Sequence, residues 1–97
     1  MLYMVIEHYK DGVAPEVYRR FRGRGRMAPE GLRYVDSWVD VSFRRCFQVM
    51  ECDDPRLLAA WIANWQDIVE FEVVPVLTSA EAAEVMGLGE AVSQVVD

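Results

Sequence analysis

Apolar residues gather in four short runs along the chain, each about as long as a β-strand. The runs are rich in β-branched and aromatic residues and lie at 2–8, 32–41, 45–52 and 70–77. A short turn near Ser42 and Phe43 separates the second run from the third. This spacing predicts a β-hairpin between the two.

The stretches after the first and last runs have the marks of helices. Pro15 stands where the first turn of a helix tolerates proline, apolar residues at helical spacing follow, and the helix should end near Gly23. After the last run, Thr78 and Glu81 have the spacing of a capping box, which predicts a further helix over 79–86.

A third helix is predicted between the third and fourth runs. Asp54 is a suitable cap and Pro55 suits the first turn. The apolar residues that follow recur at steps of three and four, as on one helix face: Leu57, Leu58, Trp61, Ile62, Trp65 and Ile68. We expect the two tryptophans to belong to the core.

The order of these elements is β-α-β-β-α-β, followed by a C-terminal helix. Two β-α-β units with right-handed crossovers, joined by a central hairpin, predict an α+β, ferredoxin-like fold with an antiparallel sheet. The last strand of that fold lies at an edge, where Pro75 is tolerated. We expect one domain over 1–97, with a core at 1–78 and a helix and tail at 79–97.

The strands also predict a partner for the second face of the sheet. Residues 2–6 and 73–77 are unbroken apolar runs, whereas a strand with one face in water alternates with polar residues. The chain has only 97 residues, 53% of them hydrophobic, and offers no third layer. We therefore expect a homodimer with its two sheets face to face, the dimeric α/β barrel.

Charge and length limit the classes of partner. A net charge of −6 argues against binding to nucleic acid or to an anionic membrane, because both need an excess of Lys and Arg. The first six residues are apolar but too few for a signal peptide, and no run approaches a membrane span. We expect a cytoplasmic protein.

Cysteine and histidine counts limit the cofactors. Cys46 and Cys52 lie about 20 Å apart if both stand in one strand, too far for a disulfide, so both should be free thiols. With a single histidine and no Cys-x-x-Cys motif, a zinc site is not expected. We predict neither a metal nor a cofactor.

Five segments carry a resemblance to a known family. They are Tyr-Arg-Arg-Phe at 18–21, Gly-Arg-Met at 25–27, Gly-Leu-Arg-Tyr-Val-Asp-Ser-Trp at 31–38, Arg-Cys-Phe-Gln-Val-Met at 45–50 and Phe-Glu-Val-Val-Pro-Val at 71–76. Over nearly its whole length the chain resembles domain-of-unknown-function family 3303. The resemblance implies a small bacterial protein of the dimeric α/β-barrel type, and it implies no activity and no catalytic residues. Many similar barrels hold small organic molecules in a cavity beside the sheet.

The first candidate site is one face of the hairpin. If the hairpin pairs symmetrically about Ser42, Asp36 lies opposite Gln48 and Tyr34 opposite Met50. The face would then carry Tyr34, Asp36, Trp38, Gln48 and Met50, while Val35, Val39, Phe47 and Val49 pack against the helices. Such a face suits a ligand pocket in which a buried Asp36 acts as a base. The alternative is that Asp36 and Trp38 only pack in the dimer interface.

Two further candidates are a histidine and a basic block. His8 is the only residue with an ordinary pKa near neutrality, and the alternative is a partly exposed residue at a strand end. Five arginines could bind an anion or an acidic partner, or could be a solvated helix end: Arg19, Arg20, Arg22, Arg24 and Arg26.

These candidates leave two hypotheses of different kinds. One is a homodimer that binds a small organic molecule and acts as a cofactor-free enzyme through Asp36 or His8. The other is a non-catalytic accessory protein that meets its partner through the arginines between 19 and 26. A cavity that receives Asp36, Trp38 and Gln48 would favour the first, and a filled interface the second.

Overall fold

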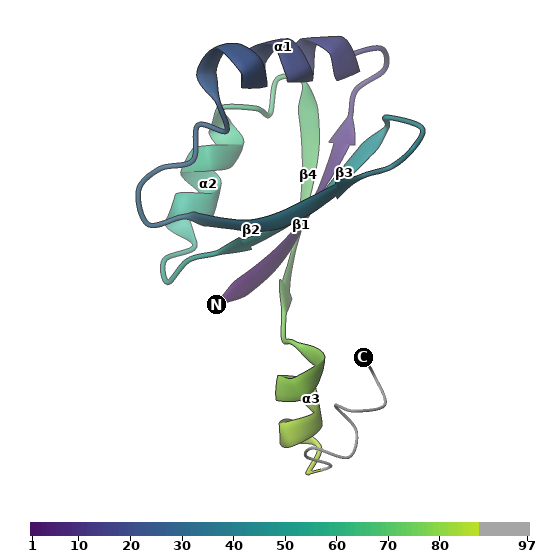
Figure 1. The fold of residues 1–97 in the computed structure, drawn as a ribbon. Helices are drawn as coiled ribbons and strands as arrows, with labels where there is room; N and C mark the ends of the chain where they lie inside the picture. Colours follow the sequence, from purple (N-terminus) through teal and green to yellow (C-terminus); the bar gives the residue numbers. More distant parts are fainter. Residues whose placement is uncertain (88–97) are drawn as a thin grey trace.

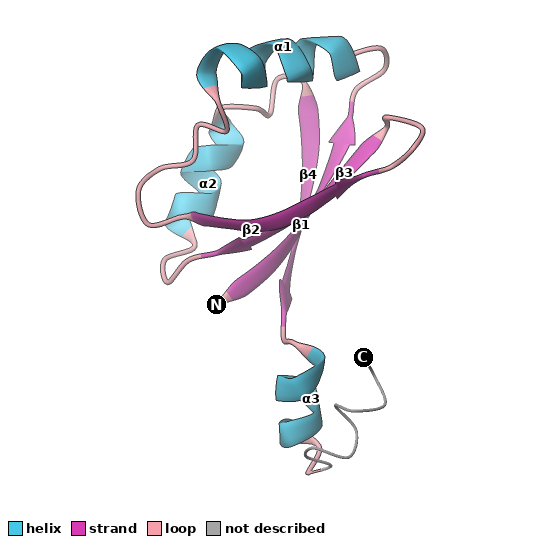
Figure 2. Ribbon diagram, viewed as in Figure 1, coloured by secondary structure: helices cyan, strands magenta, loops and turns pink. Residues whose placement is uncertain are grey.

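Four strands form one antiparallel sheet with the order β2-β3-β1-β4. The computed structural model describes residues 1–87, and the sheet is drawn in Figures 1 and 2. The strands are β1 (Leu2–Tyr9), β2 (Arg33–Val39), β3 (Arg45–Glu51) and β4 (Val69–Val76). The predicted α+β ferredoxin-like fold is confirmed, and β4 with its Pro75 lies at an edge as expected.

Three helices complete the described chain: α1 (Ala14–Arg24), α2 (Arg56–Ala63) and α3 (Ser79–Val85). Helices α1 and α2 lie on the same side of the sheet, whereas α3 follows β4 away from the rest of the domain (Figure 1). Gly25, with a φ of 69°, ends α1 in the left-handed region that glycine adopts without strain. The predicted capping box of Thr78 and Glu81 is present at the start of α3.

Helix α2 is shorter than its apolar pattern predicts. It ends at Ala63, and the chain continues through turns to Val69. Asp54 does not cap the helix with its side chain in the usual way, although its Oδ1 accepts a hydrogen bond from the Arg56 backbone N–H. Trp65 still lies in the core beyond the helix end, so its spacing predicted its burial but not its backbone.

The core lies between the sheet and the two helices α1 and α2. Val5 and Met50 from the central strands and Trp61 from α2 are fully or almost fully buried there. Trp61 is 1% exposed and stacks edge-on against Phe71 of β4. The core therefore lies on the inner face of the sheet, which is the face that the helices cover.

The pairing of β2 with β3 corrects the predicted register. Tyr34 pairs with Met50 as expected, but Asp36 pairs with Val49 and Ser37 with Gln48, because the register shifts by one residue at Val35. One extra residue in a strand turns every later side chain to the opposite face. The predicted pairing of Asp36 with Gln48 is therefore wrong.

The same correction applies to the partner strand. Phe47 and Val49 were expected to face the helices, but the residues of β3 that are buried on the inner face are Cys46, Gln48 and Met50. Phe47 and Val49 lie on the other face, which we call the outer face. The outer face carries a continuous apolar set: Leu2, Met4, Ile6, Trp38, Phe47, Val49, Val74 and Val76.

Candidate functional site

A pocket of about 240 Å³ lies between the inner face of the sheet and the helices. This volume is a little below the range of roughly 300–1,000 Å³ that is typical of ligand sites, so it suits a small molecule. Most of its wall is apolar or aromatic, and it includes Val17, Tyr18 and Phe21 from α1 as well as Trp61 and Trp65.

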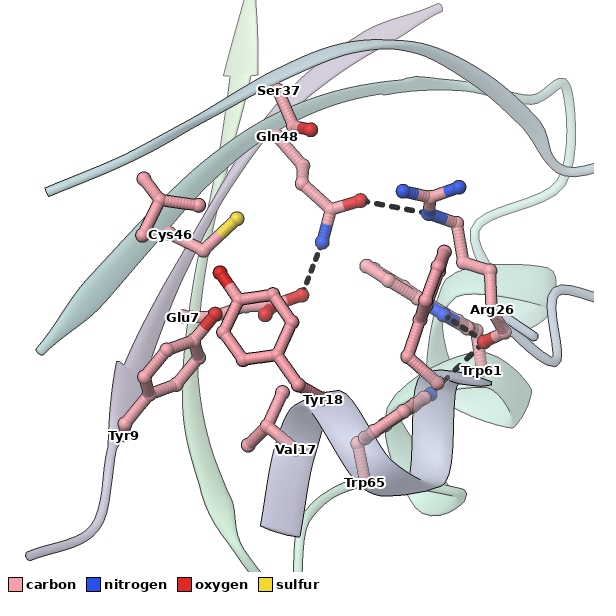
Figure 3. A pocket seen from close by; sticks show the side chains of 12 residues that line it. Glu7, Tyr9, Val17, Tyr18, Arg26, Ser37, Cys46, Gln48, Trp61 and Trp65 are labelled. Carbon is pink, nitrogen blue, oxygen red and sulfur yellow. Dashed lines mark hydrogen bonds between the residues drawn. The ribbon is translucent and has the colours of Figure 1, made fainter. Parts of the chain in front are cut away.

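A chain of three polar side chains crosses this wall. Arg26 Nε donates to Gln48 Oε1 at 3.1 Å, and Gln48 Nε2 donates to the carboxyl of Glu7. Figure 3 shows the Gln48 amide between the other two groups. Gln48 thus links a cation to an acid. Only one orientation of its amide satisfies both partners, with the oxygen towards Arg26 and the nitrogen towards Glu7.

Glu7 is the buried acid of the pocket. It points to the inner face from β1 and is only 7% exposed. Burial raises the pKa of Glu7 from 4.5 to about 7, although the hydrogen bond from Gln48 and the charge of Arg26 lower it. A carboxyl group with a pKa near neutrality can both accept and donate a proton under physiological conditions.

Two neighbours of Glu7 stay protonated at neutral pH. Burial raises the pKa of the Tyr9 phenol, and it raises the pKa of the Cys46 thiol to about 11. The charge of Glu7 adds to both effects. Cys46 is therefore held as a thiol, which is a poor nucleophile, whereas the pKa of Glu7 lies near neutrality.

Arg26 is held in place by its backbone as well as by its side chain. The indole Nε1 groups of Trp61 and Trp65 both donate to the Arg26 carbonyl oxygen, each at 3.0 Å (Figure 3). The guanidinium carbon lies 3.7 Å from the ring centre of Tyr34 and 5.2 Å from that of Phe21. These contacts hold the cation against two aromatic rings at the wall of the pocket.

The structure divides the hairpin residues that were predicted to form one site. Tyr34, Gln48 and Met50 face the helices, and Gln48 lines the pocket. Asp36 and Trp38 lie on the outer face, where both are exposed. Asp36 accepts a hydrogen bond from the Ser37 backbone N–H and does not line the pocket. The bulge at Val35 is the reason that the five residues do not meet.

His8 also lies outside the pocket. It points to the outer face, and its Nε2 is 3.4 Å from Glu72 Oε1. Its side chain is 44% exposed and that of Glu72 58%, so the pair lies in solvent.

The five arginines do not form one patch. Arg19 pairs with Glu16, and Arg20 makes a two-pronged contact with Asp67 at 2.8 and 2.9 Å. Arg26 turns into the pocket wall. Arg22 and Arg24 lie exposed in the last turn of α1, where cations complement the helix dipole.

Glu7 was the residue that sequence reasoning missed. Its signal was a lone acid at the end of an apolar strand, in phase with Tyr3 and Val5, which are both buried. An acid in phase with core residues is either buried or ends the buried part of a strand, and the sequence does not distinguish these cases. Within residues 1–87, no group of three His, Cys, Asp or Glu side chains could hold a metal ion. No helix of that segment is long and apolar enough to cross a membrane.

Comparison with models of known protein families assigns the chain to one of them. The model of the family described as "Domain of unknown function (DUF3303)" matches residues 1–89. The chain belongs to the DUF3303 family. A search of the curated proteins gives no match to this DUF3303 chain.

Two solved structures are similar to the DUF3303 chain. One is an uncharacterised NIPSNAP domain protein from Burkholderia xenovorans, 16% identical, with a TM-score of 0.48 over 80% of this chain and 96% of that one. The other is protein Atu4242 from Agrobacterium tumefaciens, 12% identical, with the same TM-score over 80% of this chain and 95% of that one.

Proposed function

We propose that this DUF3303 protein binds a small organic molecule in the pocket between its sheet and helices and exchanges a proton with it through Glu7. The observation that carries the proposal is a buried carboxyl group beside an apolar pocket, held by Gln48 and with a pKa near 7. A perturbed acid in a concave, mostly apolar pocket is the usual physical signature of a functional site. The chemistry would need no cofactor.

The acid takes over the role that the sequence suggested for Asp36 or His8. Both of those residues lie on the outer side of the sheet, and neither lines the pocket. Glu7 is enclosed by Tyr9, Tyr18 and Cys46, which all line the same pocket. Glu7 itself is only 7% exposed, and low exposure strengthens its polar contacts with a ligand.

The same proposal includes a homodimer formed through the outer face. Trp38 is 55% exposed there and Val74 39%, beside half-buried Met4, Ile6 and Val49. An apolar sheet face of this kind is a usual association surface. Two copies packed face to face would cover both outer faces and leave the pockets on the far sides of the sheets.

Two free, buried cysteines fit a reducing compartment, in keeping with a cytoplasmic location.

The accessory-protein alternative depended on a contiguous arginine patch. Two of the five arginines are engaged by acids of this chain and a third lines the pocket. The structure therefore offers no observation that favours that alternative over ligand binding.

A pocket-filling substitution tests the proposal. Val39 lines the pocket from β2, and Val39→Trp would place a bulky ring in it. The matched control is Val41→Trp, because Val41 lies in the turn, 95% exposed and outside the pocket. A library of small aromatic and alicyclic molecules would be screened by ligand-observed NMR. We expect hits on the wild type and on Val41→Trp that Val39→Trp abolishes. Hits that survive in folded Val39→Trp, or a library without hits, would contradict the proposal.

A further inference from the structure

Arg26 makes no direct ion pair with an acid of the described chain. Ion pairs within residues 1–87 engage Arg19, Arg20, Arg33, Arg45 and Arg56, and Arg26 is not among them. Its acidic neighbour is Glu7, and the Gln48 amide stands between the two. Arg26 is thus a cation at the wall of a pocket without a carboxylate partner.

The hydrogen bonds of Arg26 leave its ligand-binding end free. A guanidinium group has five N–H donors, and Nε uses its single one on Gln48. The four N–H groups of the two terminal nitrogens make no hydrogen bond within residues 1–87. Two parallel N–H donors match the two oxygens of a carboxylate, which is the commonest bidentate pairing of arginine.

The surroundings hold the guanidinium ready for such a pairing. Tyr34 and Phe21 stack on it, and the two indole N–H groups fix the backbone from which it projects. Little side-chain freedom would then be lost when an anion binds, which improves affinity. Arg22 and Arg24, exposed on the last turn of α1, have no such support.

The other walls of the pocket indicate which kind of chemical group carries the anion. Val17, Tyr18, Phe21 and the two tryptophans offer an apolar, aromatic wall in a space of about 240 Å³. A single cation compensates one negative charge, and a second charge on the ligand would meet the carboxyl of Glu7. This favours a monocarboxylate over a phosphate monoester, which carries more than one negative charge at neutral pH.

We propose that the ligand of this pocket is a small aromatic or otherwise apolar monocarboxylic acid, whose carboxylate pairs with the terminal nitrogens of Arg26. The inference rests on the proposed function, since it names the ligand class of the same pocket. Glu7 lies on the other side of the Gln48 amide from Arg26 and lines the same pocket, so it would face the part of the ligand that lies away from the carboxylate.

Matched pairs of acids and amides test this inference. Benzoate and phenylacetate would be compared with benzamide and phenylacetamide by calorimetric titration of the full-length protein at a pH of about 6, where Glu7 is mostly protonated. We expect each acid to bind about tenfold or more tightly than its amide, the gain of one charge-assisted contact. Arg26→Gln should remove that difference between acid and amide. Arg22→Gln, on the same helix end but outside the pocket, should keep it.

The outcomes separate the two proposals. Amides that bind as tightly as the acids, or acids that keep their affinity in Arg26→Gln, would overturn the monocarboxylate and leave a small-molecule pocket standing. If Arg26→Gln does not fold, the wild-type comparison of acid with amide decides alone. If neither the acids nor the amides bind, the monocarboxylate inference is overturned. The screen with Val39→Trp then tests separately whether the pocket binds any small molecule.

Discussion

Glu7 owes its chemistry to the side of the strand on which it lies. Its neighbour His8 points to the outer face and stays in solvent. Glu7 points inward, and burial moves its pKa to about 7. Gln48 opposes that shift by donating a hydrogen bond that favours the ionised form. The pKa of Glu7 is thus set mainly by desolvation, which raises it, and by the hydrogen bond from the Gln48 amide, which lowers it.

The raised pKa of Glu7 predicts how stability depends on pH. Well below pH 4.5 Glu7 is protonated in both the folded and unfolded states, so it makes no difference to how stability changes with pH. Between 4.5 and about 7 the folded state binds the proton more tightly, so stability falls as pH rises, by about 3 kcal/mol in total if the acid acts alone. Glu7→Gln mimics the protonated acid and should remove this loss.

Urea unfolding of both proteins from about pH 5 to about pH 8 would measure this. We expect the variant to be the more stable of the two at pH 8, with the difference shrinking towards pH 5. Glu30→Gln is the matched control, because Glu30 is an exposed acid in the turn before β2, and it should keep the wild-type profile. Equal slopes for wild type and Glu7→Gln would contradict the burial of the acid.

Elements of this fold differ in what supports them. The sheet and helices α1 and α2 share one core, whereas α3 projects from the end of β4 (Figure 1). A seven-residue helix has little intrinsic stability in water. The capping box of Thr78 and Glu81 supplies two reciprocal hydrogen bonds, at 3.1 and 2.9 Å, so α3 depends on its cap.

Removing the cap should therefore loosen α3 and nothing else. Thr78→Ala should cost α3 about 1 kcal/mol, which is roughly a fivefold change in its opening equilibrium. Amide exchange and Cα chemical shifts of Ala82 and Met86 would report it, because both amides donate within this helix. Ser79→Ala is the control, since Ser79 is helical but does not cap. Changes that spread to β1 would mean that α3 belongs to the core.

The molecule as a whole has one sheet face covered and one uncovered. The helices bury the inner face, and within the described chain nothing lies over the apolar set of the outer face (Figure 2). Met4 lies near the middle of that set, between Val49 of β3 and Val74 of β4. Association of two outer faces would remove this apolar surface from water, at a gain of roughly 25 cal/mol for each Å² buried.

The proposed homodimer predicts the mass of the protein in solution and a substitution that should give the monomer. Light scattering at micromolar concentration should give about 22 kDa for the wild type, twice the 11.1 kDa of one chain. Met4→Lys should give the monomer, because dimerisation would bury an unpaired charge. Val41→Lys places the same charge in the exposed turn and should remain dimeric. A monomeric wild type would contradict the face-to-face arrangement.

Local patterns were enough to predict the elements and their order. The apolar runs, the helical stripe around Trp61 and the box at Thr78 each act within a few residues, so the chain shows them directly. The edge position of Pro75 also followed, because a missing N–H restricts where a strand can lie. The predicted tail beyond residue 87 lies outside the described residues.

The site, by contrast, was decided by tertiary structure. A single bulge at Val35 moved Asp36 and Trp38 to the outer face, and the short turn before β3 gave no sign of it. Glu7 meets Gln48 across 41 positions of sequence, and the indoles that hold the Arg26 carbonyl lie 35 and 39 positions away. Local patterning sets which side chains alternate, but burial, and with it the pKa of an acid, depends on which distant residues close over it.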